Sequence, residues 1–189
     1  MQLTKELLRN AFLEGLKQNN LRVYFEKNNF YILTKGDDSS RIVAAQLICS
    51  YRINKEVHGS QNGNATDGIG HFKFTFPKWE DKIDYYVFAF LDSVNHNIEL
   101  VIVPNEILRS RFKKLNRFPA SPVKAELTLW LMPDRFIYDT TNISTEGEWY
   151  YMSKGVNGRM ADGTDWDYTE YLNNWVGWMV YFESRGSNF

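Results

Sequence analysis

The sequence predicts an α/β domain: a central mixed β-sheet flanked by helices, with a hairpin and a helix at the C-terminal end. An amphipathic helical pattern comes first, and several short segments with the spacing of β-strands follow it. A second helical pattern then precedes another alternating segment. The 189 residues suit one domain, with a core of about residues 1–118 and an elaboration of about residues 119–189.

The first helix is predicted from apolar residues at helical spacing with charged residues around them. These apolar residues are Leu3, Leu7, Leu8, Ala11, Phe12 and Leu16. Asn19 and Asn20 end the helix. Strands are then expected at residues 21–25, 30–34 and 41–51. Residues 36–39 form the hairpin turn between the last two strands, and the apolar run 42–49 indicates a central strand buried on both faces.

The second half of the chain starts with a long Gly- and Asn-rich loop at residues 54–70, and loops of this length are often functional. Further strands are predicted at residues 72–76, 85–91 and 100–103. Pro104 occupies the favoured first position of a second helix. Residues 127–131 and 135–139 are expected to pair as a hairpin, and residues 168–181 to form the C-terminal helix.

Composition limits the classes of function. A single cysteine, Cys49, excludes a disulfide-stapled secreted fold, and the N-terminus has no signal-peptide pattern, so we expect a cytoplasmic protein without a membrane segment. The net charge of -1 means that any nucleic-acid site must be a local patch. Aromatic residues make up 16% of the chain, more than a core needs, which indicates an exposed aromatic face or an interface.

A basic run around the second helix is the first candidate site. It contains Arg109, Arg111, Lys113, Lys114 and Arg117, with Lys124 beyond, against the single acid Glu106. Such a surface suits contacts with the phosphates of a DNA backbone. On composition alone, the more ordinary interpretation is a solvated helix face, because the helix dipole favours basic side chains near the C-terminus.

Three other groups of residues are candidate sites. Asp162, Asp165, Asp167 and Glu170 have a spacing that suits a hard cation, but they do not match an EF-hand loop, and a helix cap at Asp165 or Asp167 is favoured. The three histidines, His58, His71 and His96, have no metal-ligand spacing.

The third group is aromatic and C-terminal. It consists of Trp149, Tyr150, Tyr151, Trp166, Tyr168, Tyr171, Trp175 and Trp178. Such side chains either stack on nucleobases or hold the last helix on the sheet. The packing interpretation is favoured for Tyr171, Trp175 and Trp178, and both stay open for residues 149–151.

Two segments carry a family resemblance. Residues 84–92 (DYYVFAFLD), followed by residues 100–108 (LVIVPNEIL), resemble the second half of small PD-(D/E)xK nuclease-like proteins. In those proteins a strand of the type DYYVFV leads to FYIVP and then to a helix. Residues 72–76 stand where the family has the preceding strand, and residues 170–175 resemble its closing Y…W helix. The resemblance implies a restriction-endonuclease-like fold.

The family's chemistry needs an acid on one strand and a (D/E/Q)-x-K element on the next, with the acids holding Mg²⁺ and the Lys positioning the attacking water. Here Gln46 stands at the acid position, and Ile48 replaces the Lys. No acid lies in residues 30–33, while Asp37 and Asp38 lie in the following turn. Glu6 or Glu14 matches the Glu that is common on the first helix of the family.

Three interpretations follow from this pattern. The first is a nuclease-fold DNA-binding or restriction-associated protein without cleavage activity. The second is an active Mg²⁺-dependent endonuclease with migrated catalytic residues, using Asp37 or Asp38, Gln46 and a Lys such as Lys35. The third is a protein-interaction module, with a protein partner or a homodimer, which the aromatic surplus and the near-neutral charge favour.

Overall fold

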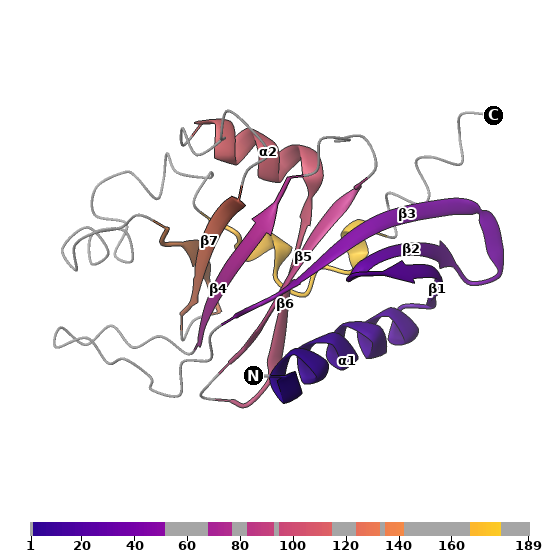
Figure 1. Cartoon of the computed structure of the whole chain (residues 1–189), viewed down its shortest axis with the longest axis horizontal. Helices are drawn as coiled ribbons and strands as arrows, with labels where there is room; N and C mark the ends of the chain where they lie inside the picture. Colours follow the sequence, from indigo (N-terminus) through magenta and orange to yellow (C-terminus); the bar gives the residue numbers. More distant parts are fainter. Residues whose placement is uncertain are drawn as a thin grey trace, which may run out of the picture.

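The computed structural model of the protein describes residues 2–51, 68–76, 83–92, 95–114, 124–132, 135–141 and 167–178. Its main element is a five-stranded sheet in the order β1-β2-β3-β5-β6 (Figure 1). These strands are β1 (Leu21–Lys27), β2 (Phe30–Lys35), β3 (Asp38–Cys49), β5 (Tyr85–Leu91) and β6 (Ile98–Pro104). Only β3 and β5 are parallel, so the predicted central mixed sheet is confirmed.

Tight turns set the register of the first three strands. Asn28 and Asn29, with φ values of 52° and 61°, connect β1 to β2 through two left-handed residues, as a type I′ hairpin requires. Gly36, with a φ of 58°, turns the chain from β2 into β3. The two turns connect the predicted strands, but β3 begins at Asp38, inside the residues 36–39 that were predicted as the turn, and it ends at Cys49.

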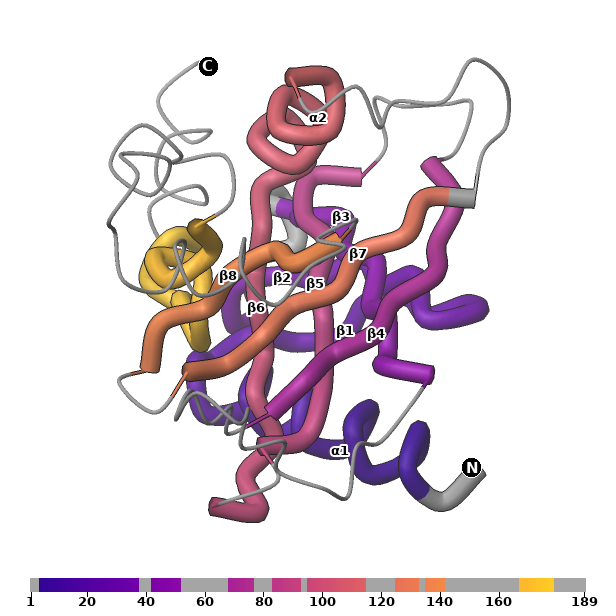
Figure 2. Tube along the Cα trace, turned by 90° about the vertical axis from the view of Figure 1, so that its left-hand side faces the viewer, coloured from indigo at the N-terminus to yellow at the C-terminus, as the bar shows by residue number. Residues whose placement is uncertain are grey.

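A second sheet, which the sequence did not predict, packs on one face of the first. It consists of β4 (Gly68–Thr75), β7 (Lys124–Leu131) and β8 (Ile137–Asp139), in that order and all antiparallel. These strands cross in front of β5 and β6 (Figure 2). Phe72, Leu127 and Leu129 share a core with Phe88 and Val101 of the large sheet. The C-terminal third of the chain therefore helps to build the main core.

The two helices lie on different sides of the large sheet. α1 (Gln2–Gln18) covers the face opposite the second sheet, with Leu8, Phe12 and Leu16 fully buried. α2 (Asn105–Lys114) stands at one end of the sheets and sends Leu108 and Phe112 into the core between them (Figure 1). The predicted flanking by helices thus holds for one face, while strands cover part of the other.

The prediction that residues 42–49 are buried on both faces is wrong for most of β3. Val43, Ala45 and Leu47 are buried beneath α1, whereas Ile42 on the other face is exposed. The reason is the position of the second sheet, which contacts β5 closely and covers only the C-terminal end of β3, where Ile48 joins the core. β3 is central in the strand order without being covered on both sides.

The predicted continuous helix at 168–181 is also wrong within the described residues. Residues 167–178, called the C-terminal strap below, contain the 3-10 helix η2 (Thr169–Tyr171), an extended Leu172, Asn173 at a φ of 49° and a helical start at 176. Tyr168 packs in the core beneath the second sheet, and Trp178 in the core beneath α1. An unbroken helix cannot serve both cores, because the strap must cross the sheet edge between them.

The C-terminal strap lies along the edges of both sheets. Asp167 forms a bridge with Tyr138 of β8, and Leu172 forms one with Val101 of β6. Trp175 and Trp178 then pack against Phe12 of α1, which confirms the packing interpretation for these aromatic residues.

The loop predicted at residues 54–70 is only partly described, because residues 52–67 lie outside the described ranges and residues 68–70 begin β4. In the described part of the chain, no helix has the length and apolar character needed to cross a bilayer.

Candidate functional site

The predicted basic residues of α2 fall into two groups. Lys113 and Lys114 are exposed on the last turn of the helix. Arg109 is half-buried: its Nε donates to Asn105 Oδ1 at 3.0 Å, and its guanidinium lies 5.1 Å from the ring centre of Phe76. The surface that α2 offers to an anion is therefore centred on its C-terminal lysines.

Arg111 belongs to the interior, although the sequence placed it among the phosphate contacts. Its side chain is 6% exposed and lies between two tyrosine rings, 4.5 Å from the centre of Tyr168 and 5.0 Å from that of Tyr171. It donates to the Asp167 carbonyl oxygen and lies 3.5 Å from a Glu170 carboxylate oxygen. Arg111 therefore fastens the C-terminal strap to α2 and is not presented to a DNA backbone.

The electrostatics of this contact follow from its burial. Burial raises the pKa of Tyr171 well above its ordinary value, and a hydrogen bond with Glu170 acts in the same direction. Of the remaining basic residues, Arg117 lies outside the described ranges, and Lys124 begins β7 with an undescribed side chain.

The residues proposed for a migrated catalytic site do not come together. Asp37 is an exposed turn residue paired with Arg22, and Asp38 is the first residue of β3. Gln46 is eight residues further along the same strand, which corresponds to roughly 26 Å of extended chain. In the β2–β3 ladder, Lys35 lies opposite Asp38 at the turn end of the two strands. Gln46 lies opposite Phe30 at the other end. One metal ion cannot bridge these positions.

Gln46 has a clear local role. Its Nε2 donates to the carbonyl oxygens of Asn28 and Asn29 at 3.4 and 3.2 Å, and the backbone N–H of Leu47 donates to Asn29 at 2.8 Å. Gln46 thus secures the β1–β2 turn against β3. Two positions later, Ile48 is buried in the core, where the family has its lysine.

Glu14, the candidate from the first helix, is exposed and lies 3.5 Å from Lys17 Nζ. It belongs to α1, which covers the face of the sheet opposite Ile48. The structure therefore does not bring Glu14 into one site with Gln46.

Asp167 and Glu170 are the only described members of the predicted acidic group. Asp167 Oδ1 accepts from the Thr169 backbone N–H at 2.8 Å, but the N-cap residue of η2 is Tyr168, and the continuous helix that Asp165 or Asp167 was expected to cap is not formed in the described residues. Glu170 pairs with Arg111. In the described part of the chain, no three His, Cys, Asp or Glu side chains group as metal ligands.

The histidines also remain apart. His71 lies on β4, with its Nδ1 3.5 Å from Thr128 Oγ1, and His96 is a turn residue with a φ of 56°. His58 lies outside the described ranges.

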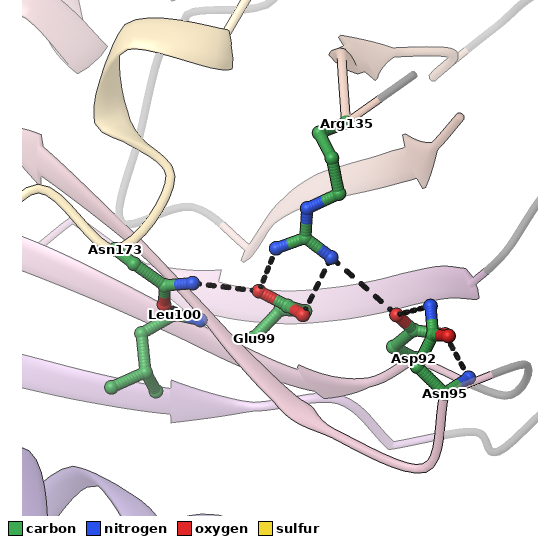
Figure 3. Close-up of polar contacts among 6 residues, drawn as sticks. All are labelled: Asp92, Asn95, Glu99, Leu100, Arg135 and Asn173. Carbon is green, nitrogen blue, oxygen red and sulfur yellow. Dashed lines mark hydrogen bonds and ion pairs between the residues drawn. The ribbon is translucent and has the colours of Figure 1, made fainter. Parts of the chain in front are cut away.

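Sequence reasoning missed a buried charge cluster at the other end of the sheets (Figure 3). Glu99 of β6 is almost fully buried, and Arg135 binds both of its carboxylate oxygens at 2.8 Å. Arg135 also reaches the buried Asp92 at 3.4 Å. One half-exposed guanidinium therefore joins two buried acids that lie on the hairpin between β5 and β6.

Two asparagines complete this cluster (Figure 3). Asn95 donates to Asp92 from both its backbone and its side chain, each at 2.9 Å. Asn173 donates to Glu99 at 2.7 Å, while its Oδ1 accepts from the Leu100 backbone at 3.0 Å. The cluster ties together the β5–β6 hairpin, the turn before β8 and the C-terminal strap. Its side chains bind one another, so the cluster holds these segments together.

One sequence signal pointed toward this cluster: Glu99 interrupts an otherwise apolar strand. A buried acid in such a strand needs a cation, but the sequence does not identify Arg135 as that cation. Comparison of the chain with protein-family models, with curated proteins and with solved structures gives no match.

Proposed function

We propose that this chain is a DNA-binding or restriction-associated protein with a restriction-endonuclease-like fold, and that it binds the DNA backbone without cleaving it. The fold part of the proposal is supported by the order of elements: α1, the antiparallel strands β1 to β3, and then β5 parallel to β3. It also rests on the resemblance of residues 84–92 and 100–108, which form β5, β6 and the start of α2.

The absence of cleavage is proposed from the positions that the resemblance assigns. Gln46 holds the carbonyl oxygens of a turn, and the next family position is the buried Ile48. The alternative carboxylates, Asp37 and Asp38, lie at the opposite end of β3. Mg²⁺-dependent phosphodiester hydrolysis needs oxygen ligands that converge on one ion, so the geometry does not favour an active endonuclease with migrated residues.

The observation that carries DNA binding is the pair of exposed lysines on the last turn of α2. Lys113 and Lys114 lie where the helix dipole is negative, and the only acid of the helix, Glu106, is in its first turn. Seven residues of helix separate Glu106 from Lys113, which is about 10 Å. The lysines therefore form a small cationic site for phosphates, of the kind that gives sequence-independent affinity.

Binding to short duplex DNA at low and moderate salt tests the proposal, with Mg²⁺ present and the DNA analysed on a gel afterwards. We expect salt-sensitive binding with intact DNA. Changing Lys113→Glu and Lys114→Glu together is expected to abolish it. The matched control changes Lys5→Glu and Lys17→Glu, which alters two exposed lysines of α1 by the same charge.

Equal loss in both double variants would indicate a general effect of net charge and would contradict a site on α2. Cleaved DNA would instead support the active endonuclease, with Mg²⁺ as its cofactor. No binding at either salt concentration would reject the DNA-binding proposal.

A protein-interaction module is the second candidate function. The observation that favours it is a group of large apolar side chains exposed on β1 and β3: Val23, Tyr24, Phe25 and Ile42. Single exposed apolar residues are common, but Phe25 and Ile42 lie on one face of the sheet with Ile32 of β2 between their strands, which indicates a contact surface.

A further inference from the structure

The face of β1, β2 and β3 that points away from α1 has an apolar centre. Phe25 pairs with Ile32, Ile32 pairs with Ala44, and Ile42 lies two residues before Ala44 on the same face. Phe25 is 44% exposed and Ile42 is 50% exposed. None of these four residues belongs to either large core cluster. We call these four residues the β1–β3 outer face.

The composition of this face is unusual for its position. An antiparallel sheet with one solvated face normally alternates apolar residues inward with polar residues outward. Here β3 has apolar residues on both sides, with Val43 and Ala45 toward α1 and Ile42 and Ala44 toward solvent. The second sheet covers the same side of β5 and β6 but leaves this half open. The pattern is that of a sheet face that packs against another surface.

The outer edge of β1 is less suited to binding than its face. The register shifts between Val23 and Phe25, which leaves Tyr24 as an extra residue that interrupts the row of backbone groups. Lys27 also lies on this edge strand, and a bulge and a lysine are common means of blocking strand addition. A partner is therefore expected to pack on the face of the sheet.

The charges at the two ends of this face suit a second copy of the chain. Lys27 is exposed at the end near the β1–β2 turn. Asp37 is 85% exposed at the opposite end, where its Oδ1 accepts from Arg22. In a two-fold symmetric contact with antiparallel strands, the Lys27 end of one copy meets the Asp37 end of the other.

We infer that the β1–β3 outer face binds a second copy of this chain, in a two-fold sheet-on-sheet contact with an apolar centre and Lys27 beside Asp37 of the other copy. None of these residues belongs to α2, so the inference goes beyond the proposed DNA binding and does not depend on it.

Sedimentation velocity over a range of protein concentrations tests the inference. The natural sequence is expected to form a dimer whose population rises with concentration. Ile42→Asp places a charge in the centre of the contact and is expected to give a monomer at every concentration. Leu7→Asp is the matched control, because Leu7 is 55% exposed on α1, outside the contact, and this variant is expected to dimerise normally. Circular dichroism establishes that both variants are folded.

Charge reversal tests the orientation of the two copies. Lys27→Asp and Asp37→Lys, each alone, are expected to raise the dimer Kd by roughly tenfold, since symmetry places the pair in the contact twice. The two reversals together are expected to give a lower Kd than either one alone, because the pair between the copies is re-formed while the Arg22–Asp37 pair within each copy stays lost.

Three results would overturn the inference: a monomer at the highest concentration, a dimer that survives Ile42→Asp, or a double reversal whose Kd is no lower than that of either single reversal. A monomer would mean that a different protein, and not a second copy, is the candidate partner for this face. Because Lys113 and Lys114 are intact in all of these variants, failure here leaves the DNA-binding test unaffected.

Discussion

Arg135 donates two parallel hydrogen bonds of 2.8 Å to the carboxylate of Glu99, although 36 residues separate the two in sequence. Arg135 has a φ of 68°, a conformation that a side chain of its type adopts rarely. The carboxylate of Glu99 is buried at the edge strand β6, where it also receives a hydrogen bond from Asn173. The pair thus links both sheets and the C-terminal strap at one point.

Replacing Arg135 is expected to destabilise the fold strongly. Arg135→Met leaves Glu99 and Asp92 buried without their cation. Loss of one partner of a buried ion pair costs about 3–5 kcal/mol, and the half-exposed guanidinium places this case near the lower limit. Urea unfolding measures the change in the free energy of unfolding.

The exposed pair between Lys17 and Glu14 supplies the control for this measurement. Lys17→Met is expected to cost only about 0–1 kcal/mol, because water already solvates both partners. Combining Arg135→Met with Glu99→Leu is expected to recover part of the loss. A double variant as unstable as the sum of its single variants would contradict the coupling of Arg135 to Glu99.

Arg111 and the neighbouring lysines are expected to separate stability from binding. Arg111→Met removes the ion pair, the contact with the Asp167 carbonyl and the stacking between two tyrosines, so we expect a loss of about 2 kcal/mol. The salt dependence of DNA binding should stay unchanged below the unfolding transition. Lys113→Glu with Lys114→Glu should instead weaken DNA binding and leave the free energy of unfolding nearly unchanged. Weaker DNA binding by Arg111→Met at unchanged stability would refute this assignment.

Gly15 is expected to be necessary for stability because it lies directly against Trp175 of the C-terminal strap. A Cβ at this position of α1 would overlap the indole ring of Trp175. Alanine favours a helix by about 1 kcal/mol over glycine, yet Gly15→Ala should destabilise the protein because the indole must move. In a Trp175→Leu background the same change should become neutral or stabilising. Urea unfolding of the four proteins in this cycle measures the coupling.

Cys49 is expected to react slowly in the folded protein. Burial raises the pKa of its thiol from 9.0 to about 11, so at pH 8 the thiolate fraction should fall roughly 100-fold below that of the unfolded chain. The rate of alkylation by iodoacetamide, with and without urea, measures this difference. Equal rates in the two states would show that the thiol is not protected.

The same shift predicts the direction of a stability change with pH. The folded pKa is the higher one, so the unfolded chain loses its thiol proton first as pH rises. The contribution of Cys49 to stability is therefore complete below about pH 9 and is lost as pH rises toward 11. Cys49→Ala should reduce the slope of stability against pH in this window, while the slope due to the tyrosines remains.

Local patterns in the sequence predicted most of the individual elements. The helical spacing of Leu8, Phe12 and Leu16 placed the first helix, and the alternation in residues 127–131 placed the hairpin strand β7. These signals are local because each element buries one face. The position of β4 outside the main sheet has no such signal, since its alternation is the same whichever sheet it joins.

The site residues were harder to predict because their roles depend on distant contacts. Arg111 and Lys113 have the same sign of charge and lie two residues apart, yet one faces the C-terminal strap and the other faces solvent. Gln46 has the residue type of a family position, but its partner is a turn that precedes it by 17 residues. The aromatic spacing at residues 168–178 indicated a helix, while two separate cores required a chain that crosses an edge.

The position of the C-terminal strap in the sequence affects when the protein can finish folding during its synthesis. During synthesis α1 and β1 to β3 emerge first, but Phe12 acquires its neighbours Trp175 and Trp178 only after more than 160 further residues have been made. Until then the edge of β6 is uncovered and the layer beneath α1 is incomplete. Folding of this domain should therefore finish only after the C-terminal strap has been made, and a ribosome stalled before residue 175 should display an α1 that is still readily cleaved by proteases.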